Sequence, residues 1–452
     1  MNKLKQSLKD MGLPADALEK IHGIEWRAQA AKPTDVLFYR LGATEKESIE
    51  NFKKRAENSN YGLLIVASKT SFALNSLKLR NCYFLSEEQF FELRLKLADV
   101  FYPVPANLKI IAVTGTNGKT TTVDIIRQLL AAEGAGVLTI GTLGVCLNDK
   151  KVKDFNLTSP DFIDLRKVLF EYGREVEVCA LEASSHAIAQ NRLSGLSFAS
   201  IGWTSFSQDH LDYHSSLEEY FEVKKSLLNH SKKSFVVSRR AGALADQIGE
   251  RVSLAKKASP PSGDFFKSEF NMVNLEVALG CLEDIGIVFE PEELDRLQPP
   301  PGRFNVIKDG ARVFIIDFAH TPNALENICK ELRASFPAKK LVAIFGCGGN
   351  RDRSKRPLMG KAAGDNADFV VLTSDNPRFE DPEKILLDIE PGLSHERYWK
   401  IVDREAAIKK AAETFSDAVI LIAGKGHEEG IEMNGEKLPY SDRKALERII
   451  NK

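Results

Sequence analysis

Short apolar runs separated by helix-like stretches recur along most of the chain. Beyond residue 105, the runs have the length of strands, and the stretches between them return apolar residues at helical spacing. The runs cover residues 108–113, 136–140, 176–181, 198–203, 312–316, 341–345, 369–372 and 419–422. This alternation predicts an α/β fold built on parallel, doubly wound sheets.

The first 105 residues read as a smaller α/β unit. Buried strands are predicted at 35–40 and 63–67, with a charged helix at 45–57 between them and an amphipathic helix at 89–99. Stiff proline-containing connectors stand at Tyr102–Pro105 and at Pro299–Gly302. Together with the chain length of 452 residues, these connectors predict three domains, over 1–105, 106–301 and 302–452.

Composition narrows the class of protein. Hydrophobic residues make up 43% of the chain and charged residues 28%, as in ordinary globular proteins. A net charge of −1 gives no electrostatic footprint for nucleic acid or an anionic membrane. No apolar run approaches 18 residues, and the six cysteines are scattered without C-x-x-C pairs. We therefore expect a soluble cytoplasmic protein without a zinc knuckle or disulfide framework.

The stretch IIAVTGTNGKTTT at 110–122 carries the first sign of chemistry. It runs from a strand through a glycine turn into a helix, so backbone N–H groups and the positive helix end would face an anion. Lys119 would reach phosphates, and the Thr120 hydroxyl could ligate Mg²⁺. The spacing is shorter than G-x-x-x-x-G-K-[ST], because only Gly115 and Gly118 frame the turn. We predict an ATP site; the alternative is an ordinary glycine turn.

Two polar clusters follow strands of the same predicted sheet, LEASSH at 181–186 and SQDHLDYH at 207–214. Open α/β sheets bind ligands at the carboxyl ends of their strands. Glu182 and His210 have the side-chain types to share a metal; otherwise Glu182 caps a helix and His210 is a hydrogen-bonded surface histidine. Lys224 and Lys225 lie on a helix beginning near Leu217, where a solvated lysine face is the default.

Four strands in the last third of the chain each end in a polar loop. The loops are DFAHTP from 317, GCGGNRDR from 346, TSDNPR from 373 and AGKGHE from 423. Each alone could be a solvated turn. All four at one sheet edge indicate a ligand crevice.

Together these motifs resemble the Mur ligases, and within them the branch that adds diaminopimelate. The resemblance covers residues 95 to 443 and rests on TGTNGKTTT, LTSPD, LEASSHAIAQNR, QDHLDYH, YFEVKKSLL, PPPGRF, DFAHTPNALEN, FGCGGNRDRSKRPLMG, TSDNPRFEDP and AGKGHE, in that order. It implies three domains: a UDP-binding N-terminal domain, a central P-loop ATPase-type domain and a C-terminal Rossmann-like domain. It also implies addition of meso-diaminopimelate to UDP-MurNAc-L-Ala-D-Glu in peptidoglycan synthesis, with ATP and Mg²⁺, through an acyl phosphate.

The resemblance assigns residues by position. The ATP contacts it implies are Gly115, Thr116, Asn117, Gly118, Lys119, Thr120, Thr121, Asn271, Asn274, Arg303 and Asp317. The metal site it implies comprises Thr120, Glu182, His210 and a carbamylated Lys224, with Lys119, Lys224 and His210 as the catalytic residues. Sequence alone would have placed Lys224 on the surface.

For the two other substrates, the resemblance implies further contacts. Those to the UDP substrate are Thr158, Ser159, Ser184, Gln190 and Arg192. Those to the amino acid are Arg351, Asp375, Asn376, Pro377, Arg378, Gly424 and Glu428. Arg378 offers a bidentate fork to the carboxylate that diaminopimelate has and lysine lacks. We expect lysine to be rejected because it would leave that guanidinium buried without an anion.

Two departures from the family pattern bear on the interpretation. Glu25-Trp26-Arg27 stands where the family has Asp-Ser-Arg, and the segment between Lys233 and Asn271 has about half the usual length. We expect a small extra sheet there to be lost or reduced to a hairpin, with 241–268 forming loop and short helix. Alternatives are a Mur-type ligase with another acceptor, of the muropeptide-recycling or folyl-polyglutamate kind, and a silent binding homologue. The expected oligomeric state is a monomer.

Overall fold

The structure is a computed structural model that describes residues 6, 11–13, 19–40, 53–54, 56–67, 79–155, 157–262 and 264–451. Its chain divides into two compact units. The first comprises Met1–Leu108, Ser159–Val178 and Ala189–Ser197, and the second comprises Lys109–Thr158, Cys179–Ile188 and Phe198–Lys452. In the part of the chain described, no helix is long and apolar enough to span a membrane.

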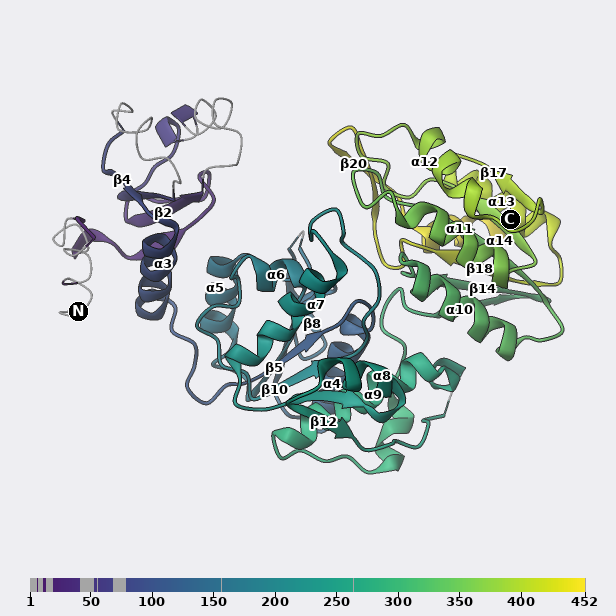
Figure 1. The fold of residues 1–452 in the computed structure, drawn as a ribbon, viewed down its shortest axis with the longest axis horizontal. Helices are drawn as coiled ribbons and strands as arrows, with labels where there is room; N and C mark the ends of the chain where they lie inside the picture. The colour runs from purple at the N-terminus through teal and green to yellow at the C-terminus, as the bar shows by residue number, and fades with distance from the viewer. Residues whose placement is uncertain are drawn as a thin grey trace. The chain divides into compact units, whose positions relative to one another are not determined.

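The first unit is built on a parallel four-stranded sheet in the order β1-β2-β3-β4. Figure 1 labels β2 and β4 of this sheet and helix α3 beside them. Its strands are β1 (Gly23–Glu25), β2 (Asp35–Arg40), β3 (Leu63–Ala67) and β4 (Cys82–Leu85). Helix α3 (Glu87–Phe101) begins with a capping box, in which Ser86 and Gln89 satisfy each other's backbone N–H groups. β2, β3 and α3 match the prediction; the charged helix expected at 45–57 lies mostly outside the described residues.

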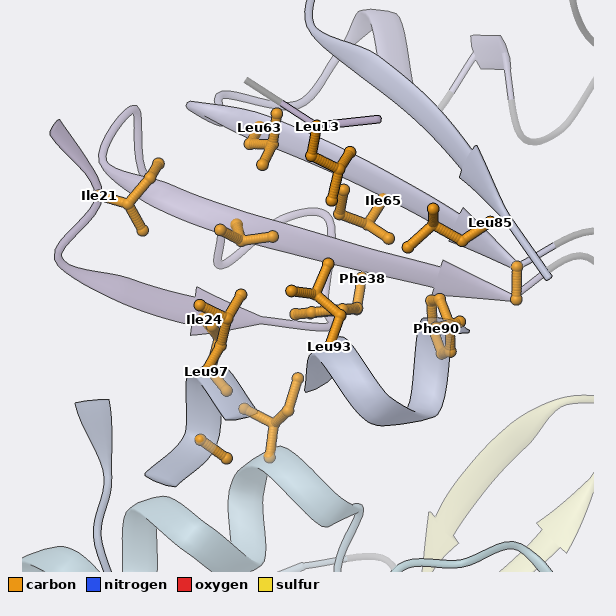
Figure 2. Close-up of a cluster of buried hydrophobic side chains, with 14 of the residues drawn as sticks. Leu13, Ile21, Ile24, Phe38, Leu63, Ile65, Leu85, Phe90, Leu93 and Leu97 are labelled. Atoms are coloured by element: carbon orange, nitrogen blue, oxygen red, sulfur yellow. The ribbon is translucent and has the colours of Figure 1, made fainter. Parts of the chain in front are cut away.

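Side chains from the sheet and from α3 form the core of this unit. Figure 2 shows Phe38 and Ile65 of the strands beside Leu93 and Leu97 of the helix. Phe162, from α5 (Phe162–Tyr172), belongs to the same buried cluster. A segment well downstream of the N-terminal sheet therefore completes its core.

The second unit contains an eight-stranded sheet in the order β12-β11-β10-β5-β9-β6-β7-β8. Its strands are β5 (Lys109–Thr114), β6 (Val137–Gly141), β7 (Gly144–Leu147), β8 (Lys150–Lys153), β9 (Val178–Glu182), β10 (Ser200–Trp203), β11 (Phe235–Ser238) and β12 (Val252–Ala255). Its helices are α4 (Lys119–Ala132), α6 (Ser185–Ala189), α7 (Leu217–Lys225), α8 (Gly242–Ile248) and α9 (Glu269–Asp284), with 3-10 turns η2 (Ser226–His230), η3 (Arg239–Ala241), η4 (Asp264–Lys267) and η5 (Pro291–Arg296). Helix α9 packs on α4, β10 and β11. The loops that follow β5, β9 and β10 leave the carboxyl ends of neighbouring strands in the middle of this sheet.

Four strands of this sheet, β7, β8, β11 and β12, were not predicted, and β8 and β12 form its two edges. β7 and β8 pair antiparallel beyond β6; β7 is short, and the lysine-rich β8 gives no apolar run. β12 pairs parallel with β11, so the expectation of only loop and helix over 241–268 was wrong. The shortened segment adds two strands, β11 and β12, to the main sheet, and the described residues there form no separate sheet.

A second sheet in this unit has six strands in the order β13-β14-β18-β15-β16-β17, parallel except for β13. The strands are β13 (Asn305–Asp309), β14 (Arg312–Asp317), β15 (Lys340–Phe345), β16 (Phe369–Leu372), β17 (Tyr398–Lys400) and β18 (Ala418–Ala423). The helices are α10 (Pro322–Ser335), α11 (Lys355–Asn366), α12 (Pro382–Ile389), α13 (Arg404–Thr414) and α14 (Asp442–Ile450), with the 3-10 turn η6 (Glu390–Gly392). A hairpin of β19 (Gly430–Met433) and β20 (Glu436–Pro439) lies between β18 and α14 in the chain.

This second sheet has the Rossmann-like form that was predicted. Alternate side chains of β14, β15 and β18 pack on α13 and α14, while α10 contacts β15 and β18, and α11 contacts β16. The four predicted strands with polar loops are β14, β15, β16 and β18. They are the four central strands of the sheet, so their loops leave the same edge.

Candidate active site

The glycine turn between β5 and α4 has the geometry of an anion site. Gly115 and Gly118 have φ angles of +147° and +90°. A Cβ atom on Gly118 would lie 2.2 Å from Oδ1 of Asn274, so glycine is required there. Gly118 caps α4 without a side-chain hydrogen bond, and the first N–H groups of a helix lack intrahelical partners. The turn therefore presents backbone donors and the positive helix end, which suit a phosphate.

Lys119 is the first residue of α4 and folds over the turn. Its Nζ donates to the carbonyl oxygens of Gly115 and Thr116, at 2.7 and 2.9 Å. Burial lowers its pKa, while Glu182 and Asp209 act in the opposite direction. A phosphate would give this half-buried ammonium a stronger partner than carbonyl dipoles do.

Glu182 ends β9, the strand beside β5, and its carboxylate reaches the start of α4. Oε2 accepts from the Thr120 hydroxyl at 3.1 Å, and Oε1 accepts from Thr142 N at 2.7 Å. Arg303 Nη2 also donates to the Thr120 hydroxyl, at 3.2 Å. No group of three or more His, Cys, Asp or Glu side chains forms a metal cage among the described residues. A hydroxyl and one carboxylate instead fit Mg²⁺, which keeps waters and takes phosphate oxygens as ligands.

Lys224 is buried, in contrast to the surface position that sequence alone suggests. The residue is 1% exposed, and Nζ donates to Gly115 O at 3.1 Å and lies 4.5 Å from the centroid of the Tyr220 ring. Burial lowers its pKa well below the usual value, and the nearby charge of Lys119 adds to this effect. Because its lowered pKa favours the neutral amine, this buried lysine has the chemistry that carbamylation requires.

His210 belongs to a charged cluster around Asp209 that the sequence reasoning did not single out. Asp209 Oδ2 lies 3.4 Å from His210 Nε2 and 3.9 Å from His320 Nε2, and Oδ1 lies 3.4 Å from Lys355 Nζ. Burial opposes ionisation of Asp209, but Lys355 and the two histidines hold its pKa below the usual value. Burial lowers the pKa of His210 to about 3, so the ring is neutral and able to bind a cation.

The signal for Asp209, His320 and Lys355 was present in the sequence, because each lies within a quoted motif. Their meeting depends on loops from both sheets of the second unit. Gln208 Nε2 donates to Ser354 Oγ at 3.2 Å, next to Lys355. Only the fold reveals that these loops share one carboxylate.

A cavity lies beside the glycine turn. It is lined by Asn117, Gly118, Thr121, Phe265, Phe270, Asn271, Arg303, Phe304, Asp317, Phe318, Ala319, Ala324, Asn327, Ile328 and Glu331. The set contains most of the predicted ATP contacts. Asn274 is completely buried with Oδ1 lacking a hydrogen-bond partner, and its Nδ2 donates to Asn271 Oδ1 at 3.3 Å. Glu331, on α10, was not predicted.

The predicted amino-acid contacts come together at the ends of β16 and β18. Asn376 Nδ2 donates to Glu428 Oε2 at 3.0 Å, and Lys425 Nζ donates to both side chains, at 2.9 and 2.8 Å. A Cβ atom on Gly424 would lie 2.6 Å from Oδ2 of Asp375, a buried oxygen without a hydrogen-bond partner. Lys425, which is fully buried, is an unpredicted member of the group.

Arg378 lies at the mouth of this group, but it is neither unpaired nor fully buried. Its side chain is 22% exposed, and Nε lies 2.8 Å from Glu432 Oε2. The premise that lysine would leave this guanidinium buried without an anion is therefore wrong. Gly348 separates Arg378 from Arg351: its Cβ atom would lie 2.9 Å from Arg378 Nη1 and 3.6 Å from Arg351 Cγ.

Known proteins share these sequence features. The Mur ligase middle domain matches residues 113–258, and the Mur ligase glutamate ligase domain matches residues 302–426. UDP-N-acetylmuramoyl-L-alanyl-D-glutamate–2,6-diaminopimelate ligase 1 of Clostridium acetobutylicum is 33% identical over 82% of this chain and 83% of its own length. The chain belongs to the Mur ligase family. The corresponding ligase of Aquifex aeolicus is 36% identical over 78% of this chain and 80% of its own length.

Solved structures of the family share the fold. A UDP-N-acetylmuramoyl-L-alanyl-D-glutamate–2,6-diaminopimelate ligase matches with a TM-score of 0.58 and 30% identity, over 95% of both chains. MurF ligase from Thermotoga maritima, in complex with ADP, matches with a TM-score of 0.61 and 16% identity, over 90% of this chain and 94% of that one. The second likeness concerns the fold alone. This Mur ligase thus has the α/β architecture built on parallel sheets that the sequence predicted.

The predicted contacts to the UDP substrate divide between the two compact units of this Mur ligase. Thr158 and Ser184 belong to the second unit, and Thr142 Oγ1 donates to Thr158 Oγ1 at 3.4 Å. The first unit holds Ser159, Gln190 and Arg192. There, Arg192 donates from Nη1 to Ser159 O at 2.8 Å and from Nε to Gln190 Oε1 at 3.0 Å.

Glu25-Trp26-Arg27, the departure from the family pattern, binds α5 within the first unit. Trp26 Nε1 and Arg27 Nη2 each donate to Asp164, both at 2.9 Å. Lys167 Nζ donates to Glu25 Oε2 at 2.7 Å. The polar groups of the motif are thus hydrogen-bonded to side chains of α5, which gives the motif a structural role in joining β1 to α5.

Proposed function

We propose that this Mur ligase joins meso-diaminopimelate to UDP-MurNAc-L-Ala-D-Glu at the expense of ATP, which is converted to ADP and phosphate. The observation that carries the proposal is that one compact unit holds both a phosphate turn and a loop ending in Arg378. The named ligases of Clostridium acetobutylicum and Aquifex aeolicus support the choice of substrates. We place the protein in the cytoplasm as a monomer.

The phosphate end of the site would bind ATP through the turn. Backbone N–H groups of the turn and Lys119 would hold the phosphates, and Asn271 and Asp317 would contact the nucleoside. Thr120 and Glu182 would hold Mg²⁺, with His210 at a second position. Bound Mg²⁺ would supply charge neutralisation for the transferred phosphoryl group.

Carbamylation would change what Lys224 offers to the site. The neutral amine attacks CO₂, forms an N–C bond and loses a proton, so a carbamate anion replaces a potential cation. A carbamate beside the glycine turn could ligate a cation, which a lysine ammonium cannot do. The buried position of Lys224 and its lowered pKa support this proposal.

The reaction would then proceed in two steps. The substrate carboxylate attacks the γ-phosphorus and the bond to ADP breaks, which gives an acyl phosphate. The acceptor amine, after losing a proton, attacks the acyl carbon; the tetrahedral intermediate collapses and phosphate leaves. Arg351 and Arg378 would bind a carboxylate of the acceptor, and Asp375 and Glu428 would bind its ammonium groups. The chain's part is to orient the two reactants.

The deciding assay is phosphate release with UDP-MurNAc-L-Ala-D-Glu, ATP and Mg²⁺, with either meso-diaminopimelate or L-lysine. We expect turnover with diaminopimelate well above that with lysine. Equal turnover would contradict the role given to Arg378, and no turnover with either would favour a silent homologue. In the Arg378→Ala variant, loss of one charged bidentate contact should weaken diaminopimelate binding by about 2–4 kcal/mol, mainly through KM.

A further inference from the structure

The β19–β20 hairpin contacts the loop of Arg378, and Glu432 of β19 makes several of these contacts (β20 is labelled in Figure 1). Glu432 N donates to Asn376 Oδ1 at 3.0 Å, and Glu432 O accepts from Arg378 N at 2.9 Å. Its carboxylate lies 2.8 Å from Arg378 Nε. Backbone and side chain of Glu432 therefore both face residues proposed to bind the acceptor.

The backbone around Arg378 fixes where its guanidinium points. Arg378 has a φ of +53°, a left-handed conformation that is unusual for a residue other than glycine. An isolated β-bridge between Arg378 and Met433 and a 2.7 Å hydrogen bond from Asn434 N to Arg378 O hold the Arg378 backbone in this conformation. Because these contacts with the hairpin hold the backbone of Arg378, they also place its side chain beside Glu432.

The donors of the guanidinium are already largely engaged. Nη1 donates to Gly349 O at 2.9 Å and, more weakly, to Asn376 O at 3.4 Å. Nε, on the side of the group that offers a bidentate edge, is paired with Glu432. A substrate carboxylate that takes two parallel hydrogen bonds from this edge needs the place that the Glu432 carboxylate holds.

We propose that Glu432 is a specificity-determining residue for the acceptor, because its carboxylate is a resident counter-ion that a carboxylated amino acid must displace. The inference rests on the proposed function and deepens it. The Glu432 side chain is 50% exposed, so it can swing into water when displaced. Lysine has no carboxylate at its distal end and leaves the Arg378–Glu432 pair intact. Glu432 thereby reduces the ratio of kcat/KM for diaminopimelate to kcat/KM for lysine.

The test compares kcat/KM for meso-diaminopimelate and L-lysine in the wild type and in Glu432→Gln. Without the resident charge, diaminopimelate binds an uncompensated guanidinium, which also repels the distal ammonium of lysine. We expect the ratio of the two kcat/KM values to rise about threefold to tenfold, chiefly through KM, as suits one partly exposed charged contact. Glu436→Gln, on the exposed strand of the same hairpin, is the matched control and should leave the ratio unchanged.

A double variant separates specificity from a structural role. With Arg378→Gln already present, Glu432→Gln should no longer change the KM for diaminopimelate. If Glu432 only supports the hairpin, its substitution will lower kcat/KM for both acceptors equally in either background, and that result overturns the inference. A wild type active with diaminopimelate whose ratio does not move in Glu432→Gln overturns it as well. A wild type that uses neither acceptor overturns the proposed function, and this inference with it.

Discussion

Lys224 holds an amine where an ammonium ion is poorly solvated. Its Nζ has a carbonyl oxygen and a ring face as neighbours, and Lys119 adds a second positive charge. Burial would normally select against lysine at such a position. The arrangement is sensible if the amine is converted to an anion, which Lys119 and bound cations would then stabilise.

We therefore expect Lys224→Ala to lose at least about 100-fold in kcat, the usual loss when a group that stabilises a transition state electrostatically is removed. Added short-chain carboxylate should restore part of the activity, because it can occupy the place of the carbamate. Lys225→Ala, one position along the same helix, is the control and should retain activity. Phosphate release measures both effects; absence of rescue would argue against carbamylation.

Glu331 is a second residue whose charge state departs from the ordinary. Burial raises its pKa to about 8, the charge of Asp317 adds to the shift and a hydrogen bond from Ser268 opposes it. One of its oxygens, Oε1, is buried without a hydrogen-bond partner. Between its ordinary pKa of 4.5 and about 8, the folded protein retains a proton that the unfolded chain releases. Stability should therefore fall as pH rises through this window and then level off.

Glu331→Gln should remove this fall in stability with rising pH, because glutamine does not ionise. In the absence of nucleotide, the variant should match the wild type near pH 4 and exceed its free energy of unfolding by about 2–4 kcal/mol at pH 9, as a shift of a few pKa units implies. Denaturant unfolding across pH measures the difference. Glu326→Gln, on the exposed side of the same helix, should show no such pH dependence. A constant difference at all pH values would mean that packing, and not ionisation, is responsible.

At the scale of elements, helices α13 and α14 are joined by a fully buried ion pair. Arg404 Nε lies 2.7 Å from Asp442 Oδ1, and both side chains are 0% exposed. The same guanidinium donates to Ser374 O and Ala423 O, at 3.2 and 2.8 Å. These carbonyls stand at the start of the loops that carry Asn376 and Lys425. The pair thus links helix packing to the placement of the amino-acid site.

Asp442→Ala should lower the stability of the C-terminal sheet by about 3–5 kcal/mol, because it leaves a buried guanidinium uncompensated. Fluorescence of Trp399, on β17, follows this sheet during urea unfolding. Arg448→Ala breaks the exposed pair with Glu405, which joins the same two helices, and should cost no more than about 1 kcal/mol. Equal losses in the two variants would contradict the importance given to burial.

Element-scale comparison also shows where sequence was sufficient. Strands β5, β9, β10, β14, β15, β16 and β18 follow from apolar runs because parallel strands are buried on both faces. β8 and β12 lie at sheet edges, where half-exposed sequences such as KKVK carry no such run. The phosphate turn could be predicted from local sequence. The burial of Lys224 and the meeting of Asp209 with Lys355 could not, since each depends on segments far apart in the chain.

At the scale of the whole molecule, each compact unit is formed from several separate segments of the chain. Ser159–Val178 and Ala189–Ser197 belong to the first unit, although Cys179–Ile188 between them, which holds most of β9 and α6, belongs to the second. The first unit nevertheless has its own sheet and core. We therefore expect it to unfold as a separate step, independent of ligands that bind only the second unit.

The three tryptophans allow this expectation to be tested, because Trp26 lies in the first unit, Trp203 on β10 and Trp399 on β17. Variants that retain one tryptophan each, with phenylalanine at the other two positions, report the unfolding of each part by fluorescence. A non-hydrolysable ATP analogue with Mg²⁺, at 100 times its Kd, should stabilise the part that binds it by about 2.7 kcal/mol. For a unit as large as the second one, that corresponds to a rise in Tm of about 4 °C.

The Trp203 transition should show this rise, and the Trp26 transition should move little, because the phosphate turn and the nucleotide cavity belong entirely to the second unit. Lys119→Ala in the Trp203 background is the control: losing the phosphate contact should reduce the shift without abolishing the fold. If Trp26 and Trp203 shift equally, the two units unfold together and the nucleotide stabilises both. If Lys119→Ala leaves the Trp203 shift intact, the analogue binds elsewhere, and the phosphate turn loses the role given to it here.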